Sequence, residues 1–120
     1  MDKKIMESIV CSLPESTDFD FIKRYDDEAT KMEEICDFES AVKNYEYEIC
    51  YLTKVYRFAI SAHNENLQYQ TYNGKHFLET AQKWKNDIIE VHKRISDMIN
   101  EHIELFVNYE PINLDELLKE

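Results

Sequence analysis

The chain has a single glycine, Gly74, and only two prolines, Pro14 and Pro111. Glycine-rich phosphate loops and dinucleotide-binding fingerprints need several glycines at fixed spacing, so both kinds of site are excluded. Most β-hairpins also place glycine in their turns, and this scarcity therefore disfavours a β-sheet fold. The long intervals between these three residues are rich in Glu, Lys, Ala, Ile and Leu, a composition that favours helices.

Cysteine and histidine are also few, and their spacing indicates no metal. The three cysteines, Cys11, Cys36 and Cys50, include no Cys-x-x-Cys pair, and we expect them to be reduced thiols of a cytoplasmic protein. The four histidines form no His-x-x-x-His pair and none follows a glutamate by three residues, so we predict no metal and no cofactor. No apolar run approaches the roughly 18 residues that span a bilayer, so we expect no membrane segment.

Basic residues are outnumbered, because 14 Lys and Arg stand against 25 Asp and Glu, for a net charge of −11. Surfaces that bind nucleic acid are built from Lys and Arg, so we expect no direct contact with nucleic acid. The apolar share of 43% is too high for a disordered acidic tail. A chain of 120 residues with this composition predicts one folded domain that spans residues 1–120.

The clearest periodicity lies after Gly74. Apolar residues recur there at alternating spacings of four and three, the pattern of a helix that packs along one face. The series is Phe77, Ala81, Trp84, Ile88, Val91, Ile95, Met98, His102 and Leu105. We predict a helix from about Lys75 to about Asn108, roughly 50 Å long at about 1.5 Å per residue.

The interval before Gly74 holds a matching series at spacings of three and four. Its members are Val42, Tyr45, Ile49, Leu52, Tyr56, Ala59, His63 and Asn66. An upstream apolar stripe, which includes Tyr25 and Met32, is out of step with this series by one residue. We therefore predict a break between two helices near residues 37–40, where Asp37 or Ser40 would cap the second helix.

Residues 64–74 are polar and end in Asn73-Gly74, a pair that tolerates positive φ and marks a chain reversal. The helices on either side should therefore pack antiparallel. Short helices are expected at both termini, the first ended by Pro14 and the last capped by Asn113. The predicted fold is an all-α, antiparallel helical bundle of three main helices with short terminal helices.

Charge is distributed unevenly along the chain. Residues 15–48 carry 12 acids and 4 bases, residues 49–96 carry 4 acids and 7 bases, and residues 97–120 carry 7 acids and 1 base. In an antiparallel hairpin the two acidic segments meet at the end remote from Gly74, where their negative field would steer a basic protein partner. The candidate contacts are Asp26, Asp27, Glu33, Glu34, Glu46, Glu48, Glu101 and Glu104.

We predict a small acidic protein without catalysis of its own that binds a protein partner. Its most concrete form is a stoichiometric inhibitor of the immunity, anti-defence or antitoxin kind, which covers a basic or nucleic-acid-binding surface of its partner. A dimeric helical adaptor is the alternative from another class, because the same apolar spacings suit a homodimer. The high content of Asn, Lys, Ile and Tyr indicates an AT-rich genome, such as that of a phage or a low-GC bacterium.

One motif resembles a catalytic site. The segment Arg57-Phe-Ala-Ile-Ser-Ala-His63 places an arginine and a histidine on a predicted helix with five residues between them. It resembles the arginine–histidine signature of HEPN-type ribonucleases, all-α domains in which such pairs from two protomers face each other and cleave RNA without metal. The likeness covers these seven residues and departs at Phe58, where that family tends to place a polar residue. In this second alternative the resemblance implies Arg57 and His63 as catalytic residues, and we predict no other catalytic residue.

Overall fold

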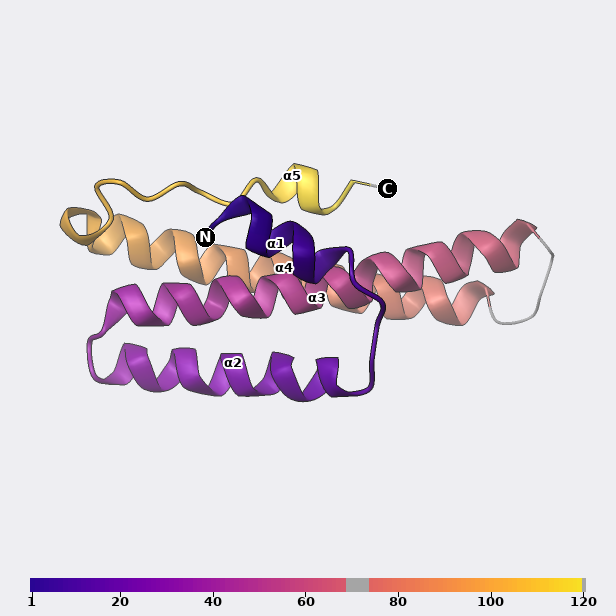
Figure 1. Ribbon diagram of the computed structural model, residues 1–120, viewed down its shortest axis with the longest axis horizontal. Coiled ribbons are helices and arrows are strands. Elements are labelled where there is room, and N and C mark those ends of the chain that lie inside the picture. The colour runs from indigo at the N-terminus through magenta and orange to yellow at the C-terminus, as the bar shows by residue number, and fades with distance from the viewer. Residues whose placement is uncertain (69–73, 120) are drawn as a thin grey trace.

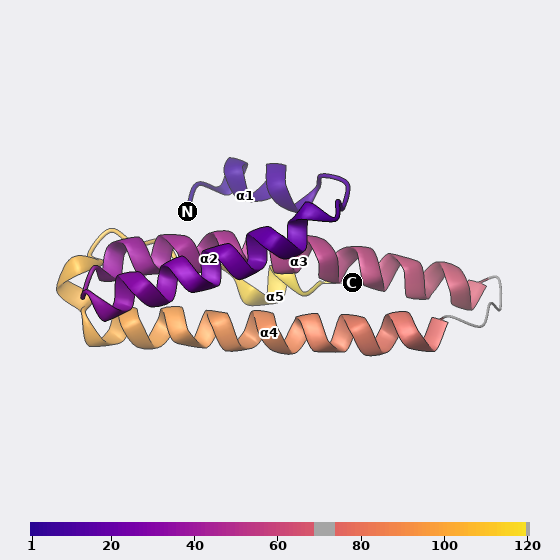
Figure 2. The same cartoon turned by 90° about the horizontal axis from the view of Figure 1, so that it is seen from below.

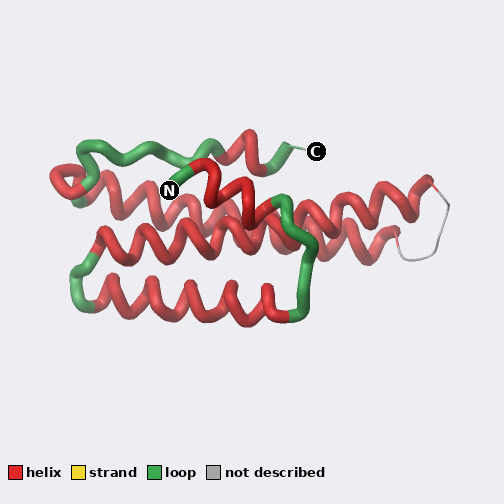
Figure 3. Tube along the Cα trace, in the orientation of Figure 1, coloured by secondary structure: helices red, strands yellow, loops and turns green. Residues whose placement is uncertain are grey.

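The computed structural model describes residues 1–68 and 74–119, and these two stretches contain helices and loops but no strand (Figure 3). The elements are α1 (Lys3–Val10), α2 (Thr17–Glu34), α3 (Phe38–Gln68), α4 (Gly74–Glu101), the 3-10 turn η1 (Ile103–Leu105) and α5 (Leu114–Leu117). The three long helices α2–α4 pack together, and a short helix lies near each end of the chain (Figure 1). The predicted all-α fold with three main helices is confirmed.

Helix α3 is the centre of the bundle. It packs antiparallel to both α2 and α4, and α1 also lies against it (Figures 1 and 2). Because α2 covers only the first part of α3, the α3–α4 hairpin continues beyond it, and the molecule measures 52 × 24 × 22 Å. The reversal predicted at Asn73-Gly74 involves residues 69–73, which lie outside the described residues.

The two apolar series predicted from the sequence form the core. From α3, every member of the series from Val42 to Ala59 is buried. From α4, the buried members are Ala81, Ile88, Val91, Ile95 and Met98. Each large side chain among them contributes about 1.5–3 kcal/mol by leaving water, so this core is the main source of stability.

The predicted break between the first two long helices lies directly after α2. The Asp37 N–H donates to the Met32 carbonyl (2.8 Å) and the Cys36 N–H donates to the Glu33 carbonyl (3.0 Å). These two bonds are the Schellman ending of a helix, which holds one residue in the left-handed region. Cys36 occupies that position with φ 62°. The Asp37 carboxylate then accepts a hydrogen bond from the Ser40 N–H (3.2 Å), so Asp37 caps α3.

The prediction that the last long helix runs to about Asn108 is wrong, because α4 ends at Glu101. A 3-10 turn follows, and the chain then returns along the bundle (Figure 1). The His102 ring stacks on Phe38 with the centroids 3.7 Å apart, which ties the end of α4 to the start of α3. Phe106 packs against the core beyond this turn. Tertiary packing of the returning segment therefore outweighs the helical periodicity that continues in the sequence.

Polar contacts anchor the loop before α2 to the bundle and cap the last helix. The Lys54 ammonium lies 2.9 Å from the Asp18 carboxylate, and both side chains are buried. The second oxygen of Asp18 accepts a hydrogen bond from the Glu15 N–H (2.7 Å), so the loop before α2 is anchored to α3. At the other terminus, Asn113 Oδ1 accepts from the Glu116 N–H (3.1 Å), and the predicted cap of the last helix is confirmed.

Candidate functional site

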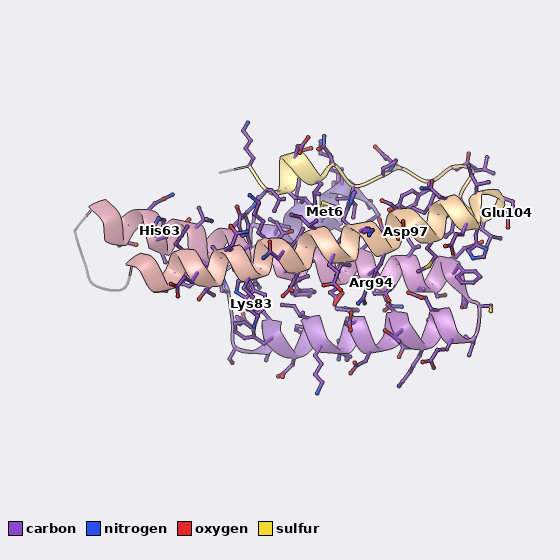
Figure 4. All side chains as sticks on the ribbon, turned by 180° about the vertical axis from the view of Figure 1, so that it is seen from behind. Met6, His63, Lys83, Arg94, Asp97 and Glu104 are labelled. Carbon is purple, nitrogen blue, oxygen red and sulfur yellow. The ribbon has the colours of Figure 1, made fainter. Side chains whose placement is uncertain are left out.

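Exposed carboxylates gather at the end of the bundle remote from the hairpin bend, which we call the acidic end. They come from the end of α2, the turn after it, the first turn of α3, the end of α4 and η1. These residues are Glu34, Asp37, Glu39, Glu101 and Glu104. Figures 1 and 2 show these elements together, and Figure 4 shows Glu104 at this end and His63 toward the other. The structure thus brings together three of the predicted contacts and adds Asp37 and Glu39.

Helix stability accounts for Asp37, which caps α3, and for Glu39 in its first turn, but not for Glu34 and Glu101. Glu34 and Glu101 are the last residues of α2 and α4, where the helix dipole favours a base by about 0.3–1 kcal/mol. Among the side chains of residues 1–65 and 77–119, none forms an ion pair with these five carboxylates. Lys31 and Lys43 are exposed in the same half of the molecule, yet neither is paired with these acids. The chain therefore leaves most of this negative charge uncompensated.

Aliphatic side chains are exposed among these carboxylates, and the contacts predicted from the sequence included none of them. Ile35, in the turn between α2 and α3, is 69% exposed. On η1 and after it, Ile103 is 66% exposed and Val107 is 79% exposed. Apolar side chains surrounded by charged groups are the usual composition of a protein-binding surface.

A hollow of about 440 Å³ lies at the acidic end between the first turns of α3 and residues 104–109. Glu39 and Glu104 line it from opposite sides, and Val42 and Phe106 contribute apolar surface. These two exposed carboxylates, with the buried Glu46 that also lines the hollow, would face any group that enters. The hollow therefore suits the side chain of a base with an aliphatic stem, such as lysine or arginine.

Three further predicted contacts lie along α2. Asp27 is exposed on the middle of the helix, away from the acidic end. Asp26 is half-buried, and its carboxylate lies 3.6 Å from the Arg94 guanidinium of α4. Glu33 is also half-buried and accepts a hydrogen bond from the Tyr45 hydroxyl (2.7 Å). Burial and the Glu33 carboxylate both raise the pKa of Tyr45. Asp26 and Glu33 thus join α2 to its neighbours, and only Asp27 is fully available to a partner.

Glu46 is not on the surface, contrary to the expectation for a contact residue, since it is only 4% exposed. Its carboxylate lies 2.9 Å from the Met1 ammonium and accepts a hydrogen bond from the Tyr109 hydroxyl (3.2 Å). Burial raises the pKa of Tyr109, and the nearby Glu46 charge adds to the effect. One buried carboxylate therefore joins the chain start, α3 and the returning C-terminal segment.

Glu48 is likewise buried, at 3% exposure, and does not contribute to the acidic surface. Burial, with the charge of Asp26 as the next cause, raises the pKa of Glu48 to about 9. Its Oε1 atom has no hydrogen-bond partner in the described part of the chain. The group is therefore neutral at pH 7, so it carries no negative charge that a basic partner would contact.

Arg57 and His63 are not brought together within one chain. Six positions along a helix correspond to a rotation that leaves two side chains about 120° apart and about 9 Å apart along the axis. Arg57 Nη2 lies 3.4 Å from the Glu116 carbonyl oxygen, on the side of α5. The resemblance places such pairs across a dimer, so the ribonuclease hypothesis stays a prediction that one chain does not test.

A second exposed apolar surface lies where α2 begins and the hairpin continues past it, and we call it the aromatic notch. It is a cavity of about 330 Å³ lined by aromatic residues of three helices, including Phe19, Phe58 and Trp84. Phe19 is 52% exposed and Phe58 is 54% exposed. The Phe19 and Trp84 rings lie 5.7 Å apart, and the Lys83 ammonium is 5.1 Å from the Trp84 centroid. Exposed aromatic groups of this kind are typical of interfaces.

In residues 1–65 and 77–119, whose side chains the structure describes, no three His, Cys, Asp or Glu side chains are placed to hold a metal ion. Over the same residues, no helix combines the length and the apolar character needed to cross a bilayer.

No model of a protein family matches the chain, and its comparison with curated proteins and with solved structures finds no significant match. The functional argument therefore depends on the geometry and charge of the surfaces described above.

Proposed function

We propose that the protein is a non-catalytic binding module whose acidic end docks on a basic surface of a protein partner, as a stoichiometric inhibitor does. The observation that carries this proposal is the presence, at one end, of uncompensated carboxylates and exposed aliphatic side chains. Such a surface has the apolar centre and charged rim of a protein interface. An active site or nucleic-acid groove lined by Lys and Arg is the partner surface that it would cover, as in immunity, anti-defence and antitoxin inhibitors.

Electrostatics would make this binding fast and sensitive to salt. Complementary fields raise association rates well above those of uncharged pairs and reject partners of the wrong charge. The Debye length is about 8 Å at physiological ionic strength and about 3 Å at about 1 M salt. Charges of the acidic end are exposed, so concentrated salt should screen them and weaken the complex.

The test is affinity capture from the natural host at low and at high salt, with two variants of equal net charge. The first variant neutralises the five carboxylates of the acidic end: Glu34→Gln, Asp37→Asn, Glu39→Gln, Glu101→Gln and Glu104→Gln. Asn at position 37 still caps α3, so this variant should fold. The control neutralises five exposed acids elsewhere: Glu7→Gln, Asp20→Asn, Glu65→Gln, Glu79→Gln and Glu110→Gln.

We expect one basic protein to be captured by the wild type and by the control variant but not by the acidic-end variant. High salt should release it, and the purified partner should bind in a one-to-one complex that blocks its activity. Equal capture by both variants would contradict the proposal, because charge alone rather than its placement would then decide binding. A complex that resists high salt would also contradict it.

The aromatic notch favours the second candidate function, a helical adaptor that forms homodimers. Exposed Phe19 and Phe58 beside Trp84 would be covered if a second chain packed there. The solution mass distinguishes the two functions: a monomer supports the inhibitor, and a dimer that persists in high salt supports the adaptor. Phe58→Glu would dissociate such a dimer and leave a monomeric inhibitor unaffected.

A further inference from the structure

Another cavity lies along the middle of the bundle, away from the five acids of the acidic end. It has a volume of about 500 Å³ and is formed by α1, the middle of α3 and residues 110–117. Figure 1 shows α1 and α5 along the middle of the bundle, and Figure 4 labels Met6 of α1 in the same part of the molecule. Its apolar lining consists of Met1, Met6, Val10, Pro111, Ile112 and Leu117.

Arg57 supplies a cation in the wall of this cavity. Its Nη2 atom lies 3.4 Å from the Glu116 carbonyl oxygen, a long hydrogen bond. Within residues 1–65 and 77–119, no carboxylate is ion-paired with the guanidinium. Its Nε atom is buried and has no acceptor in the same stretches. A half-buried cation without a counter-ion is unfavourable, and a bound anion would relieve that cost.

We propose that this cavity binds a small monocarboxylate with an apolar tail. The carboxylate accepts charge-assisted hydrogen bonds from the guanidinium of Arg57, whose planar fork matches two carboxylate oxygens. The tail lies between α1 and residues 111–117, against Met6 and Leu117. Ligand sites usually have volumes of about 300–1,000 Å³, apolar walls and a few convergent polar groups, and this cavity has all three features.

The charges around the cavity select the class of anion. Glu7, Glu110 and Glu116 line it and are exposed, as is Lys3. A dianion such as phosphate would be repelled by three carboxylates and would gain nothing from the apolar walls. A monocarboxylate meets less repulsion, which water screens at these exposed groups, and its tail removes apolar surface from water.

The chain contains its own reporter of occupancy. Cys11 is exposed and lines the cavity, whereas Cys36 is exposed at the acidic end and Cys50 is buried. Alkylation of Cys11 and Cys36 by iodoacetamide is followed in the same sample by peptide mass spectrometry, with octanoate as the probe and 1-octanol as its uncharged analogue. We expect millimolar octanoate to slow alkylation of Cys11 while Cys36 reacts at an unchanged rate, and octanol to protect Cys11 more weakly.

Variants assign the effect to the guanidinium. Arg57→Met keeps the apolar stem and removes the charge, so the octanoate concentration for half-protection should rise at least about tenfold, while that for octanol stays the same. Arg57→Lys keeps the cation but loses the planar fork, so it should restore only part of the affinity. Lys31→Met, at an exposed base outside the cavity, is the matched control with no expected change.

Three results would overturn the proposal. They are equal protection of Cys11 by octanol and octanoate, equal protection of Cys36, and no protection of Cys11 by octanoate. All three results use the wild-type chain alone, so they remain decisive even if Arg57→Met fails to fold. The outcome is independent of the acidic end, because none of the five acids replaced there lines this cavity. Of the control acids, only Glu7 and Glu110 line it.

Discussion

Glu48 provides a quantitative test of packing at the centre of the bundle. Its side chain is 3% exposed between α2 and α4. Burial, with the negative charge of Asp26 as a smaller cause, raises its pKa from 4.5 to about 9. The unfolded chain ionises this group near its ordinary pKa. Between about pH 4.5 and about pH 9, the folded state therefore holds a proton that the unfolded state has lost.

The sign of the pH dependence follows from this difference. The contribution of Glu48 to stability is fully present below about pH 4.5 and is lost as the pH rises through about 9. Within this window, each pH unit lowers the free energy of unfolding by about 1.4 kcal/mol, and the full decrease is at most about 6 kcal/mol. Glu48→Gln keeps the size of the side chain and removes the ionisation. We expect the free energy of unfolding of the variant to exceed that of the wild type by about 3 kcal/mol at about pH 7 and by less than about 1 kcal/mol near pH 5.

The assay is urea unfolding followed by far-UV circular dichroism across this pH range, for the wild type, Glu48→Gln and the exposed control Glu79→Gln. The free-energy difference between Glu48→Gln and the wild type should grow as the pH rises, whereas Glu79→Gln should follow the wild type at every pH. A difference that stays constant with pH would refute the reasoning, because it would mean that Glu48 is ionised in the folded state.

Four other substitutions test individual contacts. Cys36→Gly should raise stability by about 1 kcal/mol, because glycine adopts φ 62° without a Cβ clash; an unchanged thermal midpoint would contradict this. Lys54→Met should cost about 3–5 kcal/mol by leaving Asp18 unpaired, and adding Asp18→Asn should restore much of it in a double-mutant cycle. Glu46→Gln should cost about 3 kcal/mol in urea unfolding, since the Met1 ammonium loses its buried partner. Asn113→Ala should cost about 1 kcal/mol, seen as faster hydrogen exchange in α5, and unchanged exchange would show that the cap is unimportant.

The tertiary environment of α3 decided which acids belong to the surface. Glu46 and Glu48 lie in the same acidic segment of the sequence, residues 15–48, as several exposed acids, and both were predicted to contact a partner. In the structure α3 is covered by α1, α2, α4 and the returning C-terminal segment, so both residues are buried. A helix surrounded on several sides has no single polar face. Its sequence pattern therefore does not separate a buried, partnered carboxylate from an exposed one.

The sequence by itself determined the features that depend on local interactions. Helical periodicity, scarce glycine and a capping aspartate specify the three long helices, the break at Asp37 and the buried series from Val42 to Ala59. Only the tertiary structure decided the end of α4, the burial of Glu46 and Glu48, and the cavity beside Arg57. Each of these depends on segments distant in the chain that pack together, and their packing energy outweighs the small local preferences that a sequence displays.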